Sequence, residues 1–441
     1  MLSSQCGKQV ALCIPTYQNS KCVEDFFDNC LSYYLECSLD IYFFDSSADD
    51  ATQQVVQAQI QLHPERIFYV RWDVTIHSNA KVYHILQGLD YPMHRYQYVW
   101  FCSDAVQYTA SALGKLMAVI DKAYDVICFD PTDCEGLGCH EYLDCEHFFR
   151  DCAWVMTLYG TAVLRTKTTL TDVDWKKIEH LCLNNPSIIN FSHVTFIFRR
   201  ILQIKHPGLY HLSLGSNEFR SSVRKKTSLW RLHLTFQIFC SQWVKAMASL
   251  PYDKEAIQAA TLKMGKYSVF ASSDKFVVMR LDGIYSLREF LQYLSIWPSV
   301  CTVPRHALLR IALTPRWYYR YRYAQKRQRM LRMLQDFCQG ASKIVIYGLG
   351  RTGIIYSDFL DRRGVRYAGY CVTRKGVQEF RGYPVWSFAE LQSQSGVGFL
   401  LAMAETNAAE VMTMLQQQGV QHYLFSKELY DFVCYEMGYR G

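Results

Sequence analysis

The sequence predicts an α/β protein whose first part is a mostly parallel sheet with flanking helices. Short apolar runs alternate with amphipathic stretches over about the first 165 residues. Long aromatic and basic segments of helical character follow, and a strand, a glycine-rich turn and a helix then come together in "SKIVIYGLGRTGIIYSDFL". We therefore expect a helical middle region and a small C-terminal α/β domain.

The strands and helices of the first part are predicted from their residue types. Residues 41 to 44 (Ile-Tyr-Phe-Phe) are β-branched or aromatic, which is typical of a strand buried on both faces, and Asp45-Ser-Ser adds turn chemistry at its end. We expect further strands in "QVALCIPTY", "RIFYVRW", "YQYVWFCSDA" and "DVICFDP". Helices are expected in "KCVEDFFDNCLSYYL", "ADDATQQVVQAQIQL" and "NAKVYHILQGL". This βαβα order predicts a parallel sheet covered by helices.

Changes in texture along the chain predict its division into parts. The length of 441 residues suggests two or three domains. We expect boundaries near residues 165, 303 and 340. The predicted parts are an α/β region (1–165), a helical region (166–302), a basic aromatic helical connector (303–339) and a small α/β domain (340–441).

Composition limits the class of protein. Half of the residues are hydrophobic and 15% are aromatic, so the chain folds. We find no signal segment and no apolar run near the ~18 residues that a membrane helix needs, so we expect a cytoplasmic protein. The 17 cysteines are scattered without a framework, which favours reduced thiols over disulfides.

Two predicted strands each end on an aspartate. Asp45 follows "IYFF" and Asp104 follows "YVWFCS". In a doubly wound sheet both ends face one crevice, where ligands bind. One carboxylate can accept from a pyrimidine imide, while the other can hold a hard divalent cation on a diphosphate. Either aspartate taken alone could also be an ordinary solvated turn residue.

Three segments resemble family 2 glycosyltransferases with the GT-A fold. "VALCIPTYQNSKCVEDFFDNCL" is similar to their opening strand, "IPTYN" loop and first helix. "FFDSSADDAT" resembles their "VVDDGSTDGT", with Asp45 at the first Asp and Asp50 at the last. "YVWFCSDA" lies where the family has its DxD motif, but Cys102 replaces the first Asp and only Asp104 matches.

The resemblance is strongest to bacterial members from capsule and surface-polysaccharide clusters. Their pattern is close to "YDSSSDDxT" and they carry "TLYGA" later, whereas this chain has "TLYGTAVL" from Thr157 to Leu164. Such members often end in a small Rossmann-like domain. The resemblance therefore implies a GT-A region, a helical middle and a Rossmann-like end.

The resemblance also implies roles for particular residues. Pro15 and Tyr17 would line the nucleotide base, and Asp45 would read it, uridine being the commonest choice. Lys81, in "SNAKVYHIL", would contact the diphosphate, and Asp104 would be the ligand of Mg²⁺ or Mn²⁺.

An inverting transfer also needs a general base within reach of the acceptor hydroxyl. The family's usual "ED" at a helix start is not visible in this sequence. Asp151, in "FFRDCAWVMTLYG", and His193, in "NFSHVTF", are the candidates, and each could instead be structural.

The C-terminal "GLGRTG" supplies Gly348, Gly350 and Gly353 in a full GxGxxG between a strand and a helix. This pattern indicates a phosphate-binding turn. NAD would need an acidic residue about 20 positions on, but the next strand runs into Thr373, Arg374 and Lys375. NADP stays open, and a non-catalytic or sugar-nucleotide-sensing domain is favoured.

A cluster of cysteines and histidines raises the question of zinc. Its members are Cys128, Cys134, Cys139, His140, Cys145, His147 and Cys152. No Cys-x-x-Cys pair occurs among them, so we favour coincidence in a cysteine-rich chain over a zinc site.

From Arg305 to Arg332 there are nine Arg or Lys and no acidic residue. Trp317, Tyr318, Tyr319, Tyr321 and Tyr323 are interleaved with them. Cations together with aromatic rings suit an anionic lipid surface, so we expect peripheral membrane contact and no nucleic-acid partner. A solvated helix face is the alternative.

Together these features predict an inverting glycosyltransferase that moves a sugar from a UDP-sugar to a lipid-linked or glycan acceptor, with Mg²⁺ or Mn²⁺. One alternative is an oxidoreductase or nucleotide-sugar-modifying enzyme acting through the C-terminal domain. Another is a non-catalytic sensor of sugar nucleotides.

Overall fold

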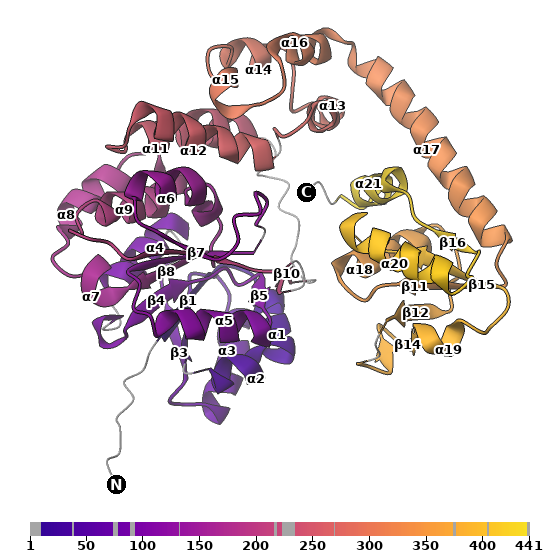
Figure 1. Ribbon diagram of the computed structural model, residues 1–441, viewed down its shortest axis with the longest axis horizontal. Helices are drawn as coiled ribbons and strands as arrows, with labels where there is room; N and C mark the ends of the chain where they lie inside the picture. Colours follow the sequence, from indigo (N-terminus) through magenta and orange to yellow (C-terminus); the bar gives the residue numbers. More distant parts are fainter. Residues whose placement is uncertain are drawn as a thin grey trace. The chain divides into compact units, whose positions relative to one another are not determined.

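A computed structural model describes residues 10–438, except 38, 74–77, 89–92, 132, 216–217, 223–233, 269, 374–375 and 404. The chain divides into two compact units, Met1–Leu313 and Thr314–Gly441 (Figure 1). No helix among the described residues combines the length and apolar character needed to cross a bilayer.

The first unit is built on an eight-stranded sheet with the order β3-β2-β1-β4-β8-β6-β9-β7. The strands are β1 (Val10–Thr16), β2 (Leu39–Asp45), β3 (Ile67–Arg71), β4 (Tyr98–Phe101), β6 (Val126–Asp130), β7 (His140–Tyr142), β8 (Ala162–Arg165) and β9 (Leu209–Ser213). The four strands from β3 to β4 are mutually parallel, and β6 is parallel to β9. Only β8 and β7 run antiparallel to their neighbours in this sheet. A two-stranded ribbon joins β5 (Val106–Tyr108) to β10 (Phe219–Ser221).

Helices cover both faces of this sheet (Figure 1). The helices of the first unit are α1 (Ser20–Asn29), α2 (Leu31–Glu36), α3 (Ala51–Leu62), α4 (Ser78–Gln87), α5 (Ala110–Ile120), α6 (Cys145–Cys152), α7 (Thr166–Thr169), α8 (Trp175–Ile178), α9 (Ser192–Ile201), α11 (Val244–Ala248), α12 (Lys254–Tyr267), α13 (Ser273–Asp282), α14 (Leu287–Gln292), α15 (Trp297–Val300) and α16 (Arg305–Leu313).

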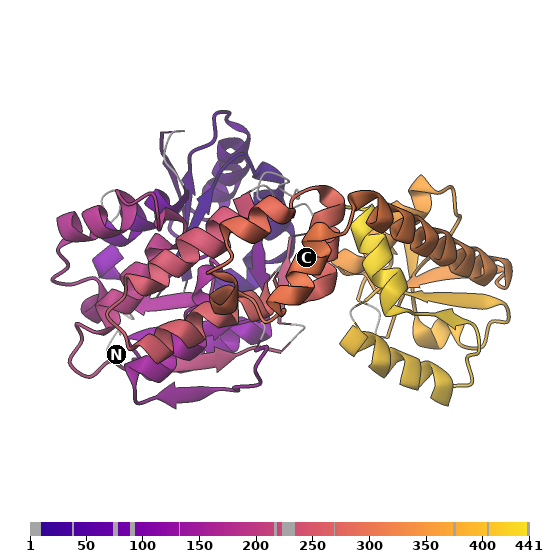
Figure 2. The ribbon, with the colours of Figure 1, turned by 90° about the horizontal axis from the view of Figure 1, so that it is seen from above.

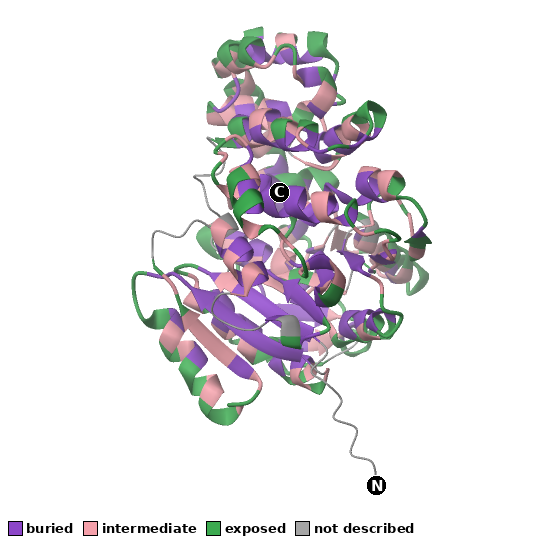
Figure 3. Cartoon of the chain, turned by 90° about the vertical axis from the view of Figure 1, so that its left-hand side faces the viewer, coloured by how far each residue is buried: buried purple, intermediate pink, exposed green. Residues whose placement is uncertain are grey.

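Side chains of β1 alternate between two apolar cores. Val10, Leu12 and Ile14 pack with residues of α1, α3 and α5 on one face. Ala11 and Cys13 pack with residues of α4, α6 and α9 on the other face. Because successive side chains of a strand point to opposite faces, a strand that is apolar at every position must be covered on both sides. The central strands are accordingly buried (Figure 3).

The structure confirms the predicted α/β class with a mostly parallel sheet and a second sheet domain. The five strands expected in the first part are present as β1, β2, β3, β4 and β6. The sequence analysis missed the short strands β5, β7 and β8 of the first part. It also missed β9 and β10, which lie in a stretch expected to be helical. The strand β9 is short, and its His211 and Ser213 obscure the apolar pattern.

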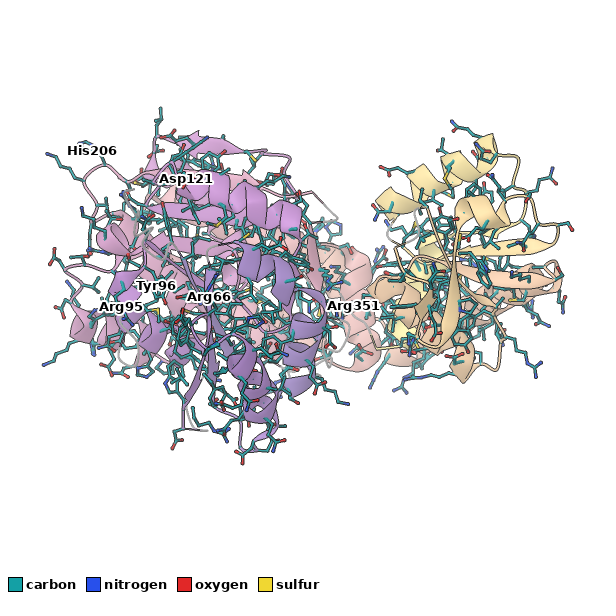
Figure 4. All side chains as sticks on the ribbon, turned by 90° about the horizontal axis from the view of Figure 1, so that it is seen from below. Arg66, Arg95, Tyr96, Asp121, His206 and Arg351 are labelled. Atoms are coloured by element: carbon teal, nitrogen blue, oxygen red, sulfur yellow. The ribbon has the colours of Figure 1, made fainter. Side chains whose placement is uncertain are left out.

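A buried polar network ties two strands together near their N-terminal ends. The hydroxyl of Tyr96 donates to Asp40 at 2.7 Å and lies 2.6 Å from the hydroxyl of Tyr42. The guanidinium of Arg66 donates to the other oxygen of Asp40 at 3.1 Å. Figure 4 labels Arg66 and Tyr96. This network lies at the N-terminal ends of the strands, whereas Asp45 lies at the C-terminal end of β2. The network therefore stabilises the fold away from the candidate site.

The second unit is a six-stranded sheet with the order β13-β14-β12-β11-β15-β16. Its elements are α17 (Arg316–Gln339), β11 (Lys343–Tyr347), α18 (Arg351–Arg362), β12 (Gly369–Val372), β13 (Glu379–Phe380), β14 (Tyr383–Ser387), α19 (Phe388–Leu391), β15 (Val397–Leu401), α20 (Glu405–Gln417), β16 (Tyr423–Leu424) and α21 (Lys427–Glu436). The long helix α17 lies along this sheet domain, where Met330, Leu334 and Phe337 join its core (Figure 2). The helix α16 ends at Leu313 and α17 begins at Arg316, so the helical path is interrupted at Pro315.

Candidate active site

The carboxyl ends of three neighbouring strands bring the predicted polar residues together. β1 lies between β2 and β4, and Thr16 at the end of β1 is in register with Asp45 at the end of β2. On the other side, the hydroxyl of Thr16 donates to Asp104, just after β4, at 2.8 Å. Thr16 therefore stands between the two aspartates, at the sheet edge where open α/β folds bind ligands.

Asp45 is fully buried and its carboxylate is saturated with donors. One oxygen accepts from the amide and the hydroxyl of Ser47, at 2.8 and 2.5 Å. The other accepts from the hydroxyl of Tyr69 at 2.8 Å and from the guanidinium of Arg71 at 3.4 Å. A buried carboxylate needs such partners, because an isolated buried charge is costly. The longest of these contacts, that of Arg71, is the one most easily exchanged for a ligand.

Lys81, on α4, points its ammonium group at the same strand ends. The Nζ atom donates to the carbonyl oxygen of Thr16 at 2.6 Å, and the side chain is only 2% exposed. Burial lowers the pKa of Lys81 to about 8, although the carboxylates of Asp45 and Asp104 act in the opposite direction. Lys81 thus supplies a positive charge beside two carboxylates.

Tyr17 and Pro15 lie at the end of β1. The Tyr17 side chain is 53% exposed, and the ammonium of Lys81 lies 5.7 Å from its ring centroid. Pro15 is half-buried. Gln18, which follows Tyr17, has a positive φ of 48°, and its amide donates to the Ser47 hydroxyl at 2.7 Å. This turn fixes an exposed aromatic ring next to a buried cation.

Cys102 cannot replace the carboxylate that the family's motif has at this position. Its side chain is 2% exposed. Burial raises the pKa of the Cys102 thiol well above its ordinary value, and the nearby Asp104 carboxylate adds to the effect. The thiol therefore stays protonated, and only thiolates are good metal ligands. Asp104, which is half-buried, is left as the single carboxylate of the motif.

One carboxylate is compatible with a bound Mg²⁺ or Mn²⁺. Ions such as Mg²⁺ are commonly held by one or two carboxylates, with waters and substrate phosphates as the remaining ligands. Asp104 offers such an oxygen beside the Thr16 hydroxyl. The residues present therefore fit a cation that arrives with a diphosphate.

Asp151 is held in a charged network between α6 and α12. Its carboxylate accepts from Lys263 at 2.7 Å, from Arg150 at 3.1 Å and from the hydroxyl of Tyr142 at 3.1 Å. Burial alone would raise the pKa of Asp151, but the hydrogen bonds from Arg150 and Lys263 outweigh burial and leave the pKa below its usual value. Such pairing is typical of a residue that joins two helices.

His193 lies at the start of α9, directly behind the end of β4. Its ring packs edge-on against Phe101 and Tyr159, with centroid distances of 6.0 and 4.9 Å. The Nε2 atom lies 3.1 Å from the carbonyl oxygen of Met156. The Nδ1 atom is buried and has no hydrogen-bond partner among the described residues. Burial lowers the pKa of His193 to about 4, so the ring is neutral at physiological pH.

The "TLYG" motif has a packing role next to the site. Gly160 adopts a φ of +116°, and a Cβ atom there would lie 2.8 Å from the Tyr108 hydroxyl and 3.1 Å from the Cys102 sulfur. Its carbonyl oxygen accepts from Trp100 at 2.8 Å and from Tyr108 at 2.9 Å. Only glycine fits, so the motif fixes the loop before β8 against the end of β4.

A second group has the spacing of metal ligands but is already internally paired. Asp130, Asp133 and His211 offer ligand atoms within 4.8 Å of one another, and no cysteine belongs to this group, which is the one metal-like set found in the described part of the chain. The two ring nitrogens of His211 lie 3.2 Å from Asp130 and 2.7 Å from the carbonyl oxygen of Gly138. Burial would lower the pKa of His211, but hydrogen bonding to Asp130 raises it overall. Both ring nitrogens are therefore already engaged by neighbours within the protein.

The cysteines singled out in the sequence do not form disulfides. All sixteen cysteines in the described ranges are free, and Cys128 and Cys152 are buried while Cys134 and Cys139 are exposed. The cysteines that lie close together in the sequence are therefore divided between the core and the surface.

The glycines of "GLGRTG" lie at the turn from β11 into α18 in the second unit. Gly348 and Gly350 precede the helix, and Gly353 lies in its first turn. Gly348 has a φ of +123°, and a Cβ on Gly353 would lie 2.2 Å from the Gly348 carbonyl oxygen. Gly350 has no heavy atom within 4 Å of its ideal Cβ position. Arg351, labelled in Figure 4, begins α18 directly afterwards. Arg374 and Lys375 lie outside the described residues.

The sequence analysis missed Arg71, Tyr69 and Thr16. Arg71 and Thr16 each end a strand of the parallel sheet, so the rule that selected Asp45 would have found them. Cys22 and Ser222 were missed as well. Burial raises the pKa of Cys22 to about 11. The nearby Asp104 carboxylate also raises this pKa, whereas hydrogen bonding with Ser222 lowers it. No sequence pattern connects Ser222 to this edge.

Comparison with known proteins bears on what the first unit does. Residues 11–187 match the family model described as glycosyl transferase family 2. No curated protein sequence matches the chain significantly.

Several solved structures resemble the chain at low identity. The mannosyltransferase PcManGT from Pyrobaculum calidifontis, in complex with GDP-Man and Mn²⁺, is 14% identical with a TM-score of 0.38, over 68% of this chain and 78% of that one. TarS 1–349 from S. aureus, in complex with UDP, is 14% identical with a TM-score of 0.40, over 73% and 91%. GlyE from Streptococcus pneumoniae TIGR4 is 8% identical with a TM-score of 0.29, over 98% and 99%.

The family match covers the strands that carry Thr16, Asp45 and Asp104. Residues 11–187 are therefore similar to family 2 glycosyltransferases, which agrees with the resemblance found in the sequence.

Proposed function

We propose that the protein transfers a sugar from a UDP-sugar to a growing surface glycan, with inversion at the transferred sugar. The acceptor would be lipid-linked or a glycan. The observation that carries the proposal is the arrangement of Asp45, Lys81 and Asp104 around Thr16 at the end of β1. A buried cation and a carboxylate lie together there, within the residues that match the family model, and this supports a diphosphate site.

The proposed donor site assigns a part to each predicted residue. Pro15 and the exposed Tyr17 ring line the base, and Asp45 accepts from its imide N–H. Because the Asp45 carboxylate already has four donors, the base would displace Arg71, whose contact is the longest at 3.4 Å. Lys81 neutralises the diphosphate.

Asp104 would hold Mg²⁺ or Mn²⁺. When bound, the cation would offset the charge that develops on the leaving diphosphate. The Thr16 hydroxyl orients the Asp104 carboxylate by its hydrogen bond of 2.8 Å. The chain itself thus fixes the only carboxylate of the incomplete motif.

Of the two candidate bases, we favour His193 over Asp151. His193 begins a helix behind β4, and its Nδ1 is unpartnered in the described structure. A neutral imidazole can take the proton of an acceptor hydroxyl. Asp151 is a weaker candidate, because Lys263 and Arg150 already hold its charge.

The remaining parts of the proposal concern the flanks of the domain. We propose that residues 166–302 form the acceptor side, that the 303–339 connector brings the enzyme to the cytoplasmic face of the membrane, and that 340–441 is a Rossmann-like domain. In the last, the turn of Gly348, Gly350 and Gly353 would receive a phosphate group, with open space above Gly350. Such a domain would sense a nucleotide.

UDP release from a panel of UDP-sugars, with and without Mn²⁺, tests the proposal. Wild-type protein should hydrolyse at least one donor slowly, and Asp104→Asn should not. Asp121→Asn is the matched control, since Asp121 is exposed and follows α5 near the opposite edge of the sheet (Figure 4). If the Asp104→Asn variant hydrolyses the donor as well as the Asp121→Asn variant does, the assignment of the site is contradicted. NADPH-dependent turnover without UDP release would favour the oxidoreductase alternative.

A further inference from the structure

The first two turns of α17 present an unusual surface. From Arg316 to Arg322 no side chain is buried, although four of these seven residues are aromatic. Trp317 is 68% exposed, Tyr321 56% and Tyr318 41%. Large aromatic side chains normally gain free energy by burial, so such a cluster marks a contact surface.

These aromatic side chains share one side of the helix. At about 100° per residue, Trp317, Tyr318 and Tyr321 lie opposite to the core-facing Met330 and Leu334. Arg320 and Arg322 lie on the two flanks between these sides. The Tyr321 hydroxyl accepts from Gln325 at 2.7 Å, which continues the outward side by one turn. The result is an aromatic stripe bordered by cations.

The cations of α17 differ along its length. In its second half Arg327 pairs with Glu436 at 3.4 Å, and Arg329 pairs with Glu428. For Arg320 and Arg322 the described part of the chain shows no ion pair. Two cations that no carboxylate offsets in the described structure therefore border the aromatic stripe.

We propose that residues 316–322 of α17 dock the enzyme onto an anionic lipid surface. Trp and Tyr rings favour the headgroup region, because they are apolar with a polar edge, and flanking Arg side chains attract anionic lipids. The stripe lies on the outward side of a helix, which suits a flat interface. Single-stranded nucleic acid is instead usually bound in a groove that tracks its backbone.

This inference deepens the proposed function, because a lipid-linked acceptor would be met at the same surface. It can nevertheless be tested without sugar transfer. Wild-type protein that hydrolyses UDP-sugars but binds no vesicles would refute docking alone. Wild-type protein that binds vesicles but hydrolyses no UDP-sugar would refute the proposed reaction alone.

The test is co-sedimentation of the full chain with vesicles of phosphatidylglycerol and phosphatidylcholine, or of phosphatidylcholine alone. We expect binding to the anionic vesicles at low salt and release at high salt, since exposed charges are screened over about 10 Å at 0.1 M. Equal binding to both vesicle types, or no binding to either, would overturn the proposal.

Matched variants locate the surface. Arg320→Gln with Arg322→Gln should weaken binding about tenfold or more, and Trp317→Ala with Tyr321→Ala should do the same. Arg327→Gln with Arg329→Gln changes the net charge equally but removes paired cations, so it should weaken binding much less. Circular dichroism checks folding. An equal loss in the control, or tighter binding to an oligonucleotide than to vesicles, would overturn the proposal.

Discussion

The ammonium of Lys81 lies 2.6 Å from the carbonyl oxygen of Thr16. Through this contact a helix that follows β3 delivers a positive charge to the end of β1, the central strand of the site. The charge is buried, and this has a consequence for pH.

Binding of UDP should weaken as pH rises through about 8. The pKa of Lys81 is lowered to about 8, so the ammonium is present below that pH and lost above it. If it neutralises the diphosphate, the dissociation constant should rise by up to about tenfold per pH unit. Titration calorimetry from pH 6.5 to 9.5 measures this. The Lys81→Met variant should bind UDP weakly at every pH. A wild-type affinity for UDP that stays constant up to pH 9.5 would show that the Lys81 ammonium does not contribute to UDP binding.

Asp104→Asn should abolish transfer while the fold is kept. The change is isosteric and removes the charge that would hold the cation, and loss of a single group of this kind usually costs 10²-fold or more. The readout is UDP release at saturating Mn²⁺, beside a melting curve. More than about a tenth of wild-type activity would show that Asp104 is not the metal ligand.

Asp45→Ala should weaken both nucleotide affinity and the fold. Its carboxylate satisfies donors from Ser47, Tyr69 and Arg71, and their loss should reduce the free energy of unfolding by about 2 to 4 kcal/mol. The limiting rate should change less than the affinity, because a group that reads the base takes no part in bond breaking. Denaturant unfolding and UDP titration measure the two effects. Asp49→Ala is the control, because Asp49 is exposed and the substitution removes a single hydrogen bond, from the amide of Ala51 to the Asp49 carboxylate.

His193 should make stability depend on pH in a particular window. Its folded-state pKa near 4 lies below the ordinary 6.5, so between these values the unfolded chain takes up the proton first. The free energy of unfolding should therefore fall as pH drops from 6.5 to 4, by on the order of 3 kcal/mol from this group.

The difference between wild type and His193→Gln isolates the contribution of His193. The difference should shrink as pH falls, whereas His206→Gln, at the exposed residue labelled in Figure 4, should show no such trend. A pH-independent difference for His193→Gln would mean that the ring is not held neutral. Catalysis by a base with this pKa should also show no loss of rate between pH 7 and 5.

A protein cut after Leu313 should keep UDP-sugar hydrolysis. The first unit ends there, and it contains Thr16, Lys81 and Asp104. A cut near residue 340 would instead keep α17 but remove the sheet domain against which its Met330, Leu334 and Phe337 pack. Circular dichroism and UDP release on residues 1–313 give the answer. A folded fragment that neither binds nor hydrolyses the donor would show that the second unit contributes to the site.

Local patterns were enough to predict much of the candidate site. Asp45 and Asp104 each end an apolar run, and the parallel order then brings both to one edge. The hydrogen bond from Arg71 to the Asp45 carboxylate could not be predicted, because it depends on β3 lying next to β2 with these two residues in register. The pairing of Asp151 with Lys263 joins residues 112 positions apart, so no local pattern reports it. For the same reason the short strand β9, whose partners are distant in sequence, was missed.

The closeness of Gly353 to the Gly348 carbonyl oxygen changes what a glycine fingerprint can mean. Any side chain at 353 would collide with backbone at 2.2 Å, and Gly348 adopts a backbone angle that other residues avoid. Folding alone therefore suffices to retain these two glycines during evolution, even in a chain whose turn binds no ligand. Gly350, which faces open space, is under no such constraint, and its replacement in related chains would be the first sign of a domain kept purely as scaffold.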